Sequence, residues 1–123
     1  MLSRGVWRAL AWLGTAILLV LCYAPTPEVP GPDVPHADKL AHVAAFFAVA
    51  LAWRLSGLSV RGTLLVGILL ILVTEIGQAL LPTGRQGDVM DALGDLAGIL
   101  AALLAAPRLR AWAVRRAAEG PAA

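Results

Sequence analysis

Three sets of polar side chains recur at helical spacing in a sequence that is otherwise strongly apolar. Most members of a set are three, four or seven residues apart, so each set shares one face of a helix. Carboxylates and an imidazole brought together on facing helices can coordinate a cation, bind a polar ligand, or transfer a proton. The sets are Asp38 with His42, Thr74 and Glu75 with Gln78, and Asp88 with Asp91 and Asp95.

The composition indicates what kind of protein carries these sets. Hydrophobic residues make up 59% of the 123 residues and charged residues 15%, whereas soluble proteins average roughly 45–50% and about 25%. A soluble domain this small needs more polar residues to cover its surface. The apolar content excludes intrinsic disorder, and the single Cys22 excludes a disulfide scaffold and a Cys/His zinc finger. An integral membrane protein remains.

Four apolar segments predict an all-α integral membrane fold, an up-down bundle of four transmembrane helices in a single domain over 1–123. The segments are rich in Leu and Ala and lack the alternation typical of membrane strands. We expect the first segment to stay in the membrane, because no good signal-peptide cleavage site follows it. The expected helices are about 7–24, 39–57, 62–81 and 88–106, with a proline-rich outer loop over 25–38 and a basic tail over 107–123.

The distribution of basic residues predicts the orientation of the bundle. Arg and Lys are concentrated at both termini and between the second and third segments, so the positive-inside rule puts the N- and C-termini in the cytoplasm. The basic tail is expected to anchor on anionic lipid. The arginines flank apolar segments and form no stripe with aromatic residues, so we expect no nucleic-acid partner.

This topology brings the three polar sets to one depth. All of them fall at the outer ends of the second, third and fourth helices, within the outer third of the bilayer. Ionisable groups at this depth are expected to face the bundle interior or a wet cavity, and they mark a functional site by default. Gly94 and Gly98 form a small-residue pair that lets a neighbouring helix approach beside Asp91 and Asp95.

Each of these residues also has a purely structural interpretation. Asp38 and Asp88 can cap the helices that they open, with Asp91 completing a capping box after Asp88. Lys39 with Glu75, and Arg85 with Asp91, can form ion pairs that orient helices. His42 alone could be a hydrogen-bonded buried side chain. Charged groups gathered at one depth favour the functional interpretation.

The ordered polar residues resemble the VanZ-like family over about residues 38–104. This resemblance implies a small polytopic protein of the bacterial plasma membrane, and the family's namesake is linked to low-level teicoplanin resistance in Gram-positive bacteria. The chain departs from the family pattern at Asp95, where Asn is usual, so an extra acidic group changes the charge of the site. The matching residues are Asp38-Lys39-x-x-His42, Glu75-x-x-Gln78, Gly84-Arg85, Asp88-x-x-Asp91 and the small-residue helix through Gly98.

The leading hypothesis is an outward-facing site for an envelope lipid headgroup, or for part of a lipid-anchored glycopeptide, giving low-level glycopeptide tolerance. Lys39 and Arg85 would contact phosphate or carboxylate. Glu75, Gln78 and Asp91 would orient these cations and accept donors from sugar or amide groups. No cofactor is needed for this role, and membrane lipid is the expected partner. The predicted ligand-binding residues are Asp38, Lys39, His42, Glu75, Gln78, Arg85, Asp88, Asp91 and Asp95.

Two alternatives stay open. In a membrane-embedded hydrolase or transferase on a lipid-linked substrate, the catalytic candidates would be His42, Glu75 and Asp91. These residues with Asp95 could hold Mg²⁺, Mn²⁺ or Ca²⁺ to activate water, or His42 could act as a general base without metal. In a structural accessory subunit, the polar residues would only cap and orient helices.

Overall fold

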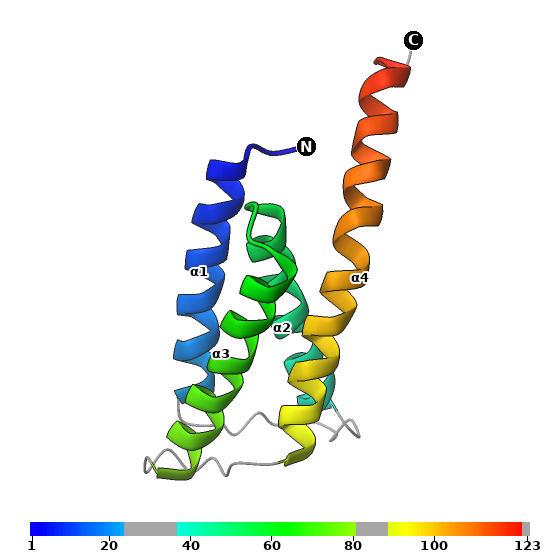
Figure 1. Ribbon diagram of the computed structural model, residues 1–123. Helices are drawn as coiled ribbons and strands as arrows, with labels where there is room; N and C mark the ends of the chain where they lie inside the picture. Colours follow the sequence, from blue (N-terminus) through cyan, green and yellow to red (C-terminus); the bar gives the residue numbers. More distant parts are fainter. Residues whose placement is uncertain (24–36, 81–88, 122–123) are drawn as a thin grey trace.

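The computed structural model describes residues 1–23, 37–80 and 89–121, and every regular element in these ranges is a helix. The elements are α1 (Arg4–Tyr23), α2 (Ala37–Leu55), α3 (Val60–Leu80) and α4 (Val89–Glu119), shown in Figure 1. The prediction of an all-α fold is confirmed. The helix ends agree with the predicted ends to within about three residues, except at the end of α4.

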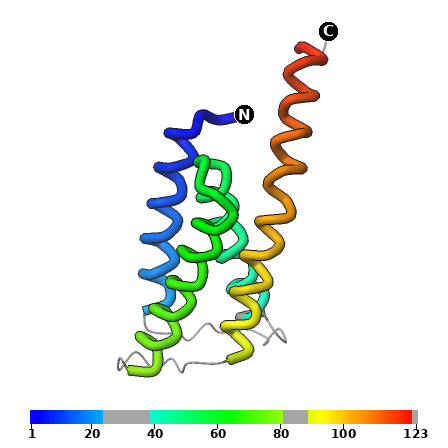
Figure 2. The backbone as a smooth tube through the Cα atoms, viewed as in Figure 1, coloured from blue at the N-terminus to red at the C-terminus, as the bar shows by residue number. Residues whose placement is uncertain are grey.

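Successive helices run in opposite directions, as Figures 1 and 2 show. The start of α1, the α2–α3 turn and the end of α4 lie on one side of the molecule. The end of α1, the start of α2, the end of α3 and the start of α4 lie on the opposite side. We call the first side the terminal end and the second side the loop end. This alternation brings His42, Gln78 and Asp91 to the loop end from three different helices.

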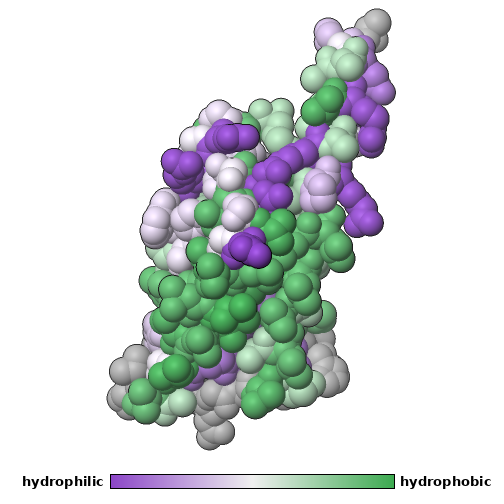
Figure 3. All heavy atoms as spheres, in the orientation of Figure 1, coloured by the Kyte–Doolittle hydropathy of each residue, from purple (hydrophilic) through white to green (hydrophobic). Residues whose placement is uncertain are grey.

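Three helices are long and apolar enough to cross a membrane, namely α1, α3 and α4. The remaining helix, α2, has 19 residues and carries Asp38, Lys39 and Arg54 near its two ends. The apolar side chains of the three candidate spans point outward in large numbers, as is typical of a lipid-facing surface. Figure 3 shows this apolar surface as a continuous region on the face in view.

The tightest packing joins α2 to α4. Phe46, Ile99 and Ala102 are almost completely buried in the core between the helices. Gly98 lies directly against the backbone of α2, because a Cβ atom there would be 2.4 Å from the Val43 carbonyl oxygen. The small-residue pair predicted from sequence therefore does bring a neighbouring helix close to α4, with Gly98 as its critical member.

The fourth helix is much longer than predicted. The sequence placed its end near Ala106, but α4 continues through Pro107 to Glu119. Proline removes one backbone donor and disfavours a helical residue before it, which is why a helix end was expected. The segment after Pro107 is rich in Ala and Arg, both strong helix formers, so the helix continues despite this one interruption.

Candidate functional site

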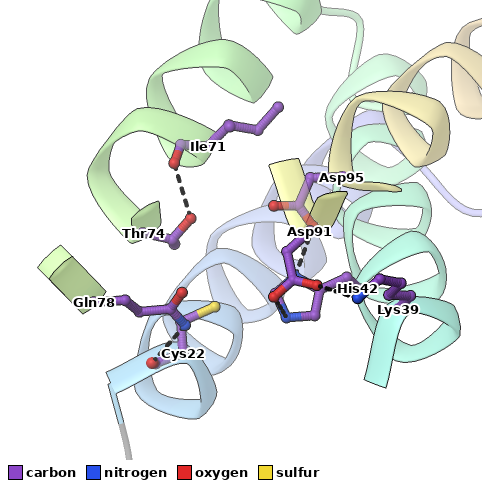
Figure 4. A network of polar contacts seen from close by, with 8 residues as sticks. All are labelled: Cys22, Lys39, His42, Ile71, Thr74, Gln78, Asp91 and Asp95. Atoms are coloured by element: carbon purple, nitrogen blue, oxygen red, sulfur yellow. Dashed lines mark hydrogen bonds and ion pairs between the residues drawn. The ribbon is translucent and has the colours of Figure 1, made fainter. Parts of the chain in front are cut away.

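A hydrogen bond between α2 and α4 forms the centre of the site. His42 Nδ1 lies 2.8 Å from Asp95 Oδ1, and the Asp95 side chain is completely buried. A carboxylate can only accept, so Nδ1–H is the donor when Asp95 is ionised. This contact fixes the orientation of the imidazole ring, as Figure 4 shows.

The same histidine connects Asp95 to a second carboxylate nearer the loop end. His42 Nε2 lies 3.9 Å from Asp91 Oδ2, and Asp91 Oδ1 lies 3.6 Å from Lys39 Nζ. The side chains of His42 and Asp91 are 8% and 11% exposed, whereas that of Lys39 is 35% exposed. Polar groups therefore run from a dry interior at Asp95 to a partly exposed ammonium at Lys39. We call these four residues the polar chain.

Helical spacing and close packing together build the polar chain. Lys39 and His42 are one turn apart on α2, and Asp91 and Asp95 are one turn apart on α4, so each pair shares a face. Gly98 lies one turn beyond Asp95 and lets the two backbones approach. The carboxylates of α4 can therefore reach the imidazole and ammonium of α2.

The charges of the polar chain balance one another when His42 is protonated. Lys39 supplies one positive charge against the two carboxylates, and protonation of His42 would balance the second. Breaking a buried pair by removing one partner typically costs about 3–5 kcal/mol, because the other charge is left uncompensated in a medium of low dielectric constant. Pairing within the chain thus makes it tolerable to bury Asp95 completely.

Two polar residues of α3, Thr74 and Gln78, form hydrogen bonds outside the polar chain. Gln78 Nε2 donates to the Cys22 carbonyl oxygen at 3.0 Å, and Thr74 Oγ1 donates to the Ile71 carbonyl oxygen at 3.1 Å. Figure 4 shows the Gln78 side chain extending to Cys22 at the end of α1. Gln78 therefore satisfies a carbonyl in the last turn of α1. Thr74 and Gln78 are nearly fully buried and Glu75 is half-buried, with its Oε1 atom shielded from solvent.

Several predicted site residues lie outside the described residues. They are Gly84, Arg85 and Asp88, together with the proline-rich loop; for Asp38 the helical backbone is described but the side chain is not. Among the described residues Lys39 pairs with Asp91, a pair that the sequence did not suggest.

Within the described ranges, no group of three or more His, Cys, Asp or Glu side chains is arranged to hold a metal ion. The reason lies in the imidazole ring, because Asp95 contacts Nδ1 and Asp91 faces Nε2. The two carboxylates therefore lie on different sides of the ring and do not converge on one point (Figure 4). A cation at this site would need ligands beyond these three residues, or a different ring orientation.

One contact near the loop end has no counterpart in the sequence analysis. The Tyr23 hydroxyl donates to the Val73 carbonyl oxygen and connects the end of α1 to α3. Gly77 makes room for the ring, because a Cβ atom there would lie within 2.2 Å of the Tyr23 oxygen. In the sequence, a tyrosine at the end of an apolar helix suggests that its hydroxyl finds a hydrogen-bond partner, but it does not show which residue that partner is.

Comparison with known protein families agrees with this arrangement. The family model described as VanZ/LLP1 matches residues 4–110, a range that includes the whole polar chain. No curated protein and no solved structure matches the chain. The match covers most of the sequence and confirms the resemblance noted from the ordered polar residues. Together with the three long apolar helices, it identifies a membrane protein, and the chain belongs to the VanZ/LLP1 family.

Proposed function

We propose that this VanZ-family membrane protein binds the anionic headgroup of an envelope lipid, or of a lipid-linked envelope precursor, at its loop end. The observation that carries the proposal is the polar chain itself. Its inner members are buried and mutually paired, while the Lys39 side chain at its outer end is 35% exposed. A partly exposed cation supported by buried carboxylates suits a phosphate or carboxylate ligand.

Asp91 supports the same proposal, because its carboxylate offers a hydrogen-bond acceptor to the ligand. Its Oδ1 atom is buried and accepts no hydrogen bond from the described residues, and it lies 3.6 Å from Lys39 Nζ. A sugar hydroxyl or an amide N–H of a headgroup could donate to this oxygen while its phosphate contacts Lys39. We expect Arg85 to add a second cation from its predicted position in the neighbouring loop.

The proposal includes a topology and a location. We propose that all four helices cross the bacterial plasma membrane, with both termini in the cytoplasm and the loop end facing outward. In α2 the charged residues lie near the two ends and the middle is apolar, which is compatible with a span. A headgroup bound on the outer side would be shielded from glycopeptides, which gives low-level teicoplanin tolerance.

A susceptibility assay tests this role. A Gram-positive host expresses the wild type, Lys39→Gln, Asp91→Asn or Arg61→Gln, and membrane levels are matched by blotting. Arg61→Gln is the control, because it removes one exposed positive charge at the terminal end. We expect the wild type and Arg61→Gln to raise teicoplanin tolerance, and the two polar-chain variants to lose it. Equal protection by all four proteins, or none by the wild type, would contradict the proposal.

A second candidate function is supported by the contact between Asp95 and His42. A carboxylate that holds Nδ1–H leaves Nε2 as the basic nitrogen, and this atom faces Asp91 near the loop end. Such an imidazole could act as the general base of a hydrolase or transferase on a lipid-linked substrate, with or without a divalent cation. Under this alternative, His42→Gln would abolish product formation while the substrate still binds. Under the leading proposal, no product forms with the wild type either.

A further inference from the structure

Three arginines from three helices meet at the terminal end, far from the polar chain along the helices. Arg54 closes α2, and its Nη1 donates to the Leu58 carbonyl oxygen at 2.8 Å. Arg110 of α4 donates from Nη2 to the Arg54 carbonyl oxygen. The Arg4 side chain of α1 lies over the α2–α3 turn, since a Cβ atom on Gly57 would be 3.5 Å from Arg4 Cδ. We call these three residues the arginine cluster.

The positive charge of this cluster is not compensated by the described part of the chain. None of the three arginines forms an ion pair with a carboxylate there, and Arg4 and Arg54 are close enough to repel Arg110. Arg54 Nε is also shielded from solvent, with no hydrogen-bond partner among the described residues. Guanidinium groups held together in this way favour an anion that can accept several N–H donors.

An apolar groove lies at the same end of the molecule as the cluster. It encloses about 640 Å³ between the first residues of the chain and the distal part of α4, within the usual range for a small-molecule site. Leu109 on its wall is next to Arg110 in sequence, and Trp7 is one helical turn from Arg4. Arg116 stacks over the Trp112 ring at 5.6 Å. The groove is thus lined mainly by apolar side chains, with the guanidinium of Arg116 in its wall.

Helix length places both features at the level of lipid headgroups. At 1.5 Å per residue the 31 residues of α4 extend roughly 46 Å, whereas the hydrocarbon core is about 30 Å thick. The excess of α4 projects beyond the other helices at the terminal end, where Figure 3 shows hydrophilic side chains gathered. About 20 residues of α4 cross this core, so the groove, whose α4 lining starts at Leu109, begins at the boundary between hydrocarbon and headgroups.

We propose that the arginine cluster and this groove bind one anionic phospholipid from the leaflet at the terminal end. The guanidinium groups of Arg4, Arg54 and Arg110 would bind the phosphodiester, and an acyl chain would lie along the groove between Trp7 and Trp112. This lipid site is separate from the headgroup site at Lys39 and does not depend on it. It selects lipids by net negative charge, because a zwitterionic headgroup adds a cation beside three arginines.

The test uses the full chain, purified in a non-ionic detergent and titrated with phosphatidylglycerol, with bound lipid counted by native mass spectrometry. We expect saturation at one tightly retained lipid, and about tenfold weaker retention of phosphatidylcholine. Arg4→Gln is expected to weaken phosphatidylglycerol retention about tenfold, since it removes a charge-assisted contact. Arg4 makes no hydrogen bond that the fold needs among the described residues, so this variant is expected to fold.

Arg61→Gln is the matched control, because it removes an exposed positive charge at the same end outside the cluster. It should retain phosphatidylglycerol as the wild type does. Equal retention of the two lipids, or equal loss in both variants, would overturn the proposal in favour of diffuse electrostatic attraction. In a second experiment, inorganic phosphate is added to the lipid-bound protein, and it should not displace the lipid. Full displacement by phosphate would show a simple anion site without a role for the groove.

Discussion

Replacing Gly98 by alanine should separate α2 from α4 and break the polar chain without touching any of its members. An added Cβ would lie 2.4 Å from the Val43 carbonyl oxygen and 3.0 Å from the Phe47 backbone nitrogen. Both neighbours are backbone atoms, which cannot rotate away. Restoring the 3.4 Å of an ordinary contact at Val43 requires a shift of about 1 Å.

The magnitude follows from two terms. Overpacking of a tight interface costs about 1–3 kcal/mol. A shift of about 1 Å would also lengthen the 2.8 Å contact between His42 and Asp95 beyond hydrogen-bond distance, and a hydrogen bond to a charged group contributes about 1.5–3 kcal/mol. The two costs sum to about 2.5–6 kcal/mol, and the helix preference of alanine over glycine offsets up to about 1 kcal/mol. We therefore expect Gly98→Ala to lower the free energy of unfolding by about 2–5 kcal/mol.

Gly94→Ala is the matched control on the same helix face, one turn away. A Cβ there would meet Val43 Cγ2 at 3.5 Å and the Lys39 carbonyl oxygen at 3.7 Å, which are ordinary contacts. Alanine also favours helix over glycine, so this variant should be neutral or more stable by up to about 1 kcal/mol. The assay is reversible unfolding in mixed micelles followed by circular dichroism. Equal effects of the two substitutions would refute the packing argument.

Three further predictions concern single contacts. Asp95→Asn keeps an acceptor for His42 and should change the free energy of unfolding by less than about 1 kcal/mol. Asp95→Ala removes the acceptor and should lower the free energy of unfolding by about 3 kcal/mol in the same assay. Gln78→Leu removes the hydrogen bond from Nε2 to the Cys22 carbonyl and should cost about 1–2 kcal/mol. Gln78→Glu should not restore this bond, because an ionised carboxylate cannot donate. Pro107→Ala should leave the helix content nearly unchanged and raise the free energy of unfolding in the same assay, since α4 is already continuous there and the substitution restores a backbone donor; a lower free energy of unfolding would contradict this.

The sequence predicts much of this fold, because the apolar segments and their charged flanks are physically distinct. Composition alone indicates a helical membrane protein, and the period of the polar residues places His42, Asp91 and Asp95 on inward faces. The length of α4 was not predictable in the same way. A proline is usually read as a helix end, but its effect depends on the propensity of the residues that follow.

The site, like the fold, could be predicted only in part. The spacing correctly indicates which faces of α2 and α4 carry the polar chain, since i,i+3 and i,i+4 relations belong to the helix itself. It could not show that Gln78 is directed toward α1, because the choice between two neighbouring helices depends on how α3 is rotated about its axis. The ion pair of Lys39 with Asp91 likewise depends on how α2 and α4 pack against each other.

Direct binding at the loop end is the measurement that tests the central claim. A polyprenyl-diphosphate-linked envelope precursor is titrated into the purified wild type, Lys39→Gln and Arg61→Gln in nanodiscs, and retained ligand is counted by native mass spectrometry. Our account predicts saturable retention by the wild type and Arg61→Gln, and about tenfold weaker retention by Lys39→Gln, as expected for a lost charge-assisted contact. Equal retention by all three proteins would contradict binding of the headgroup at Lys39.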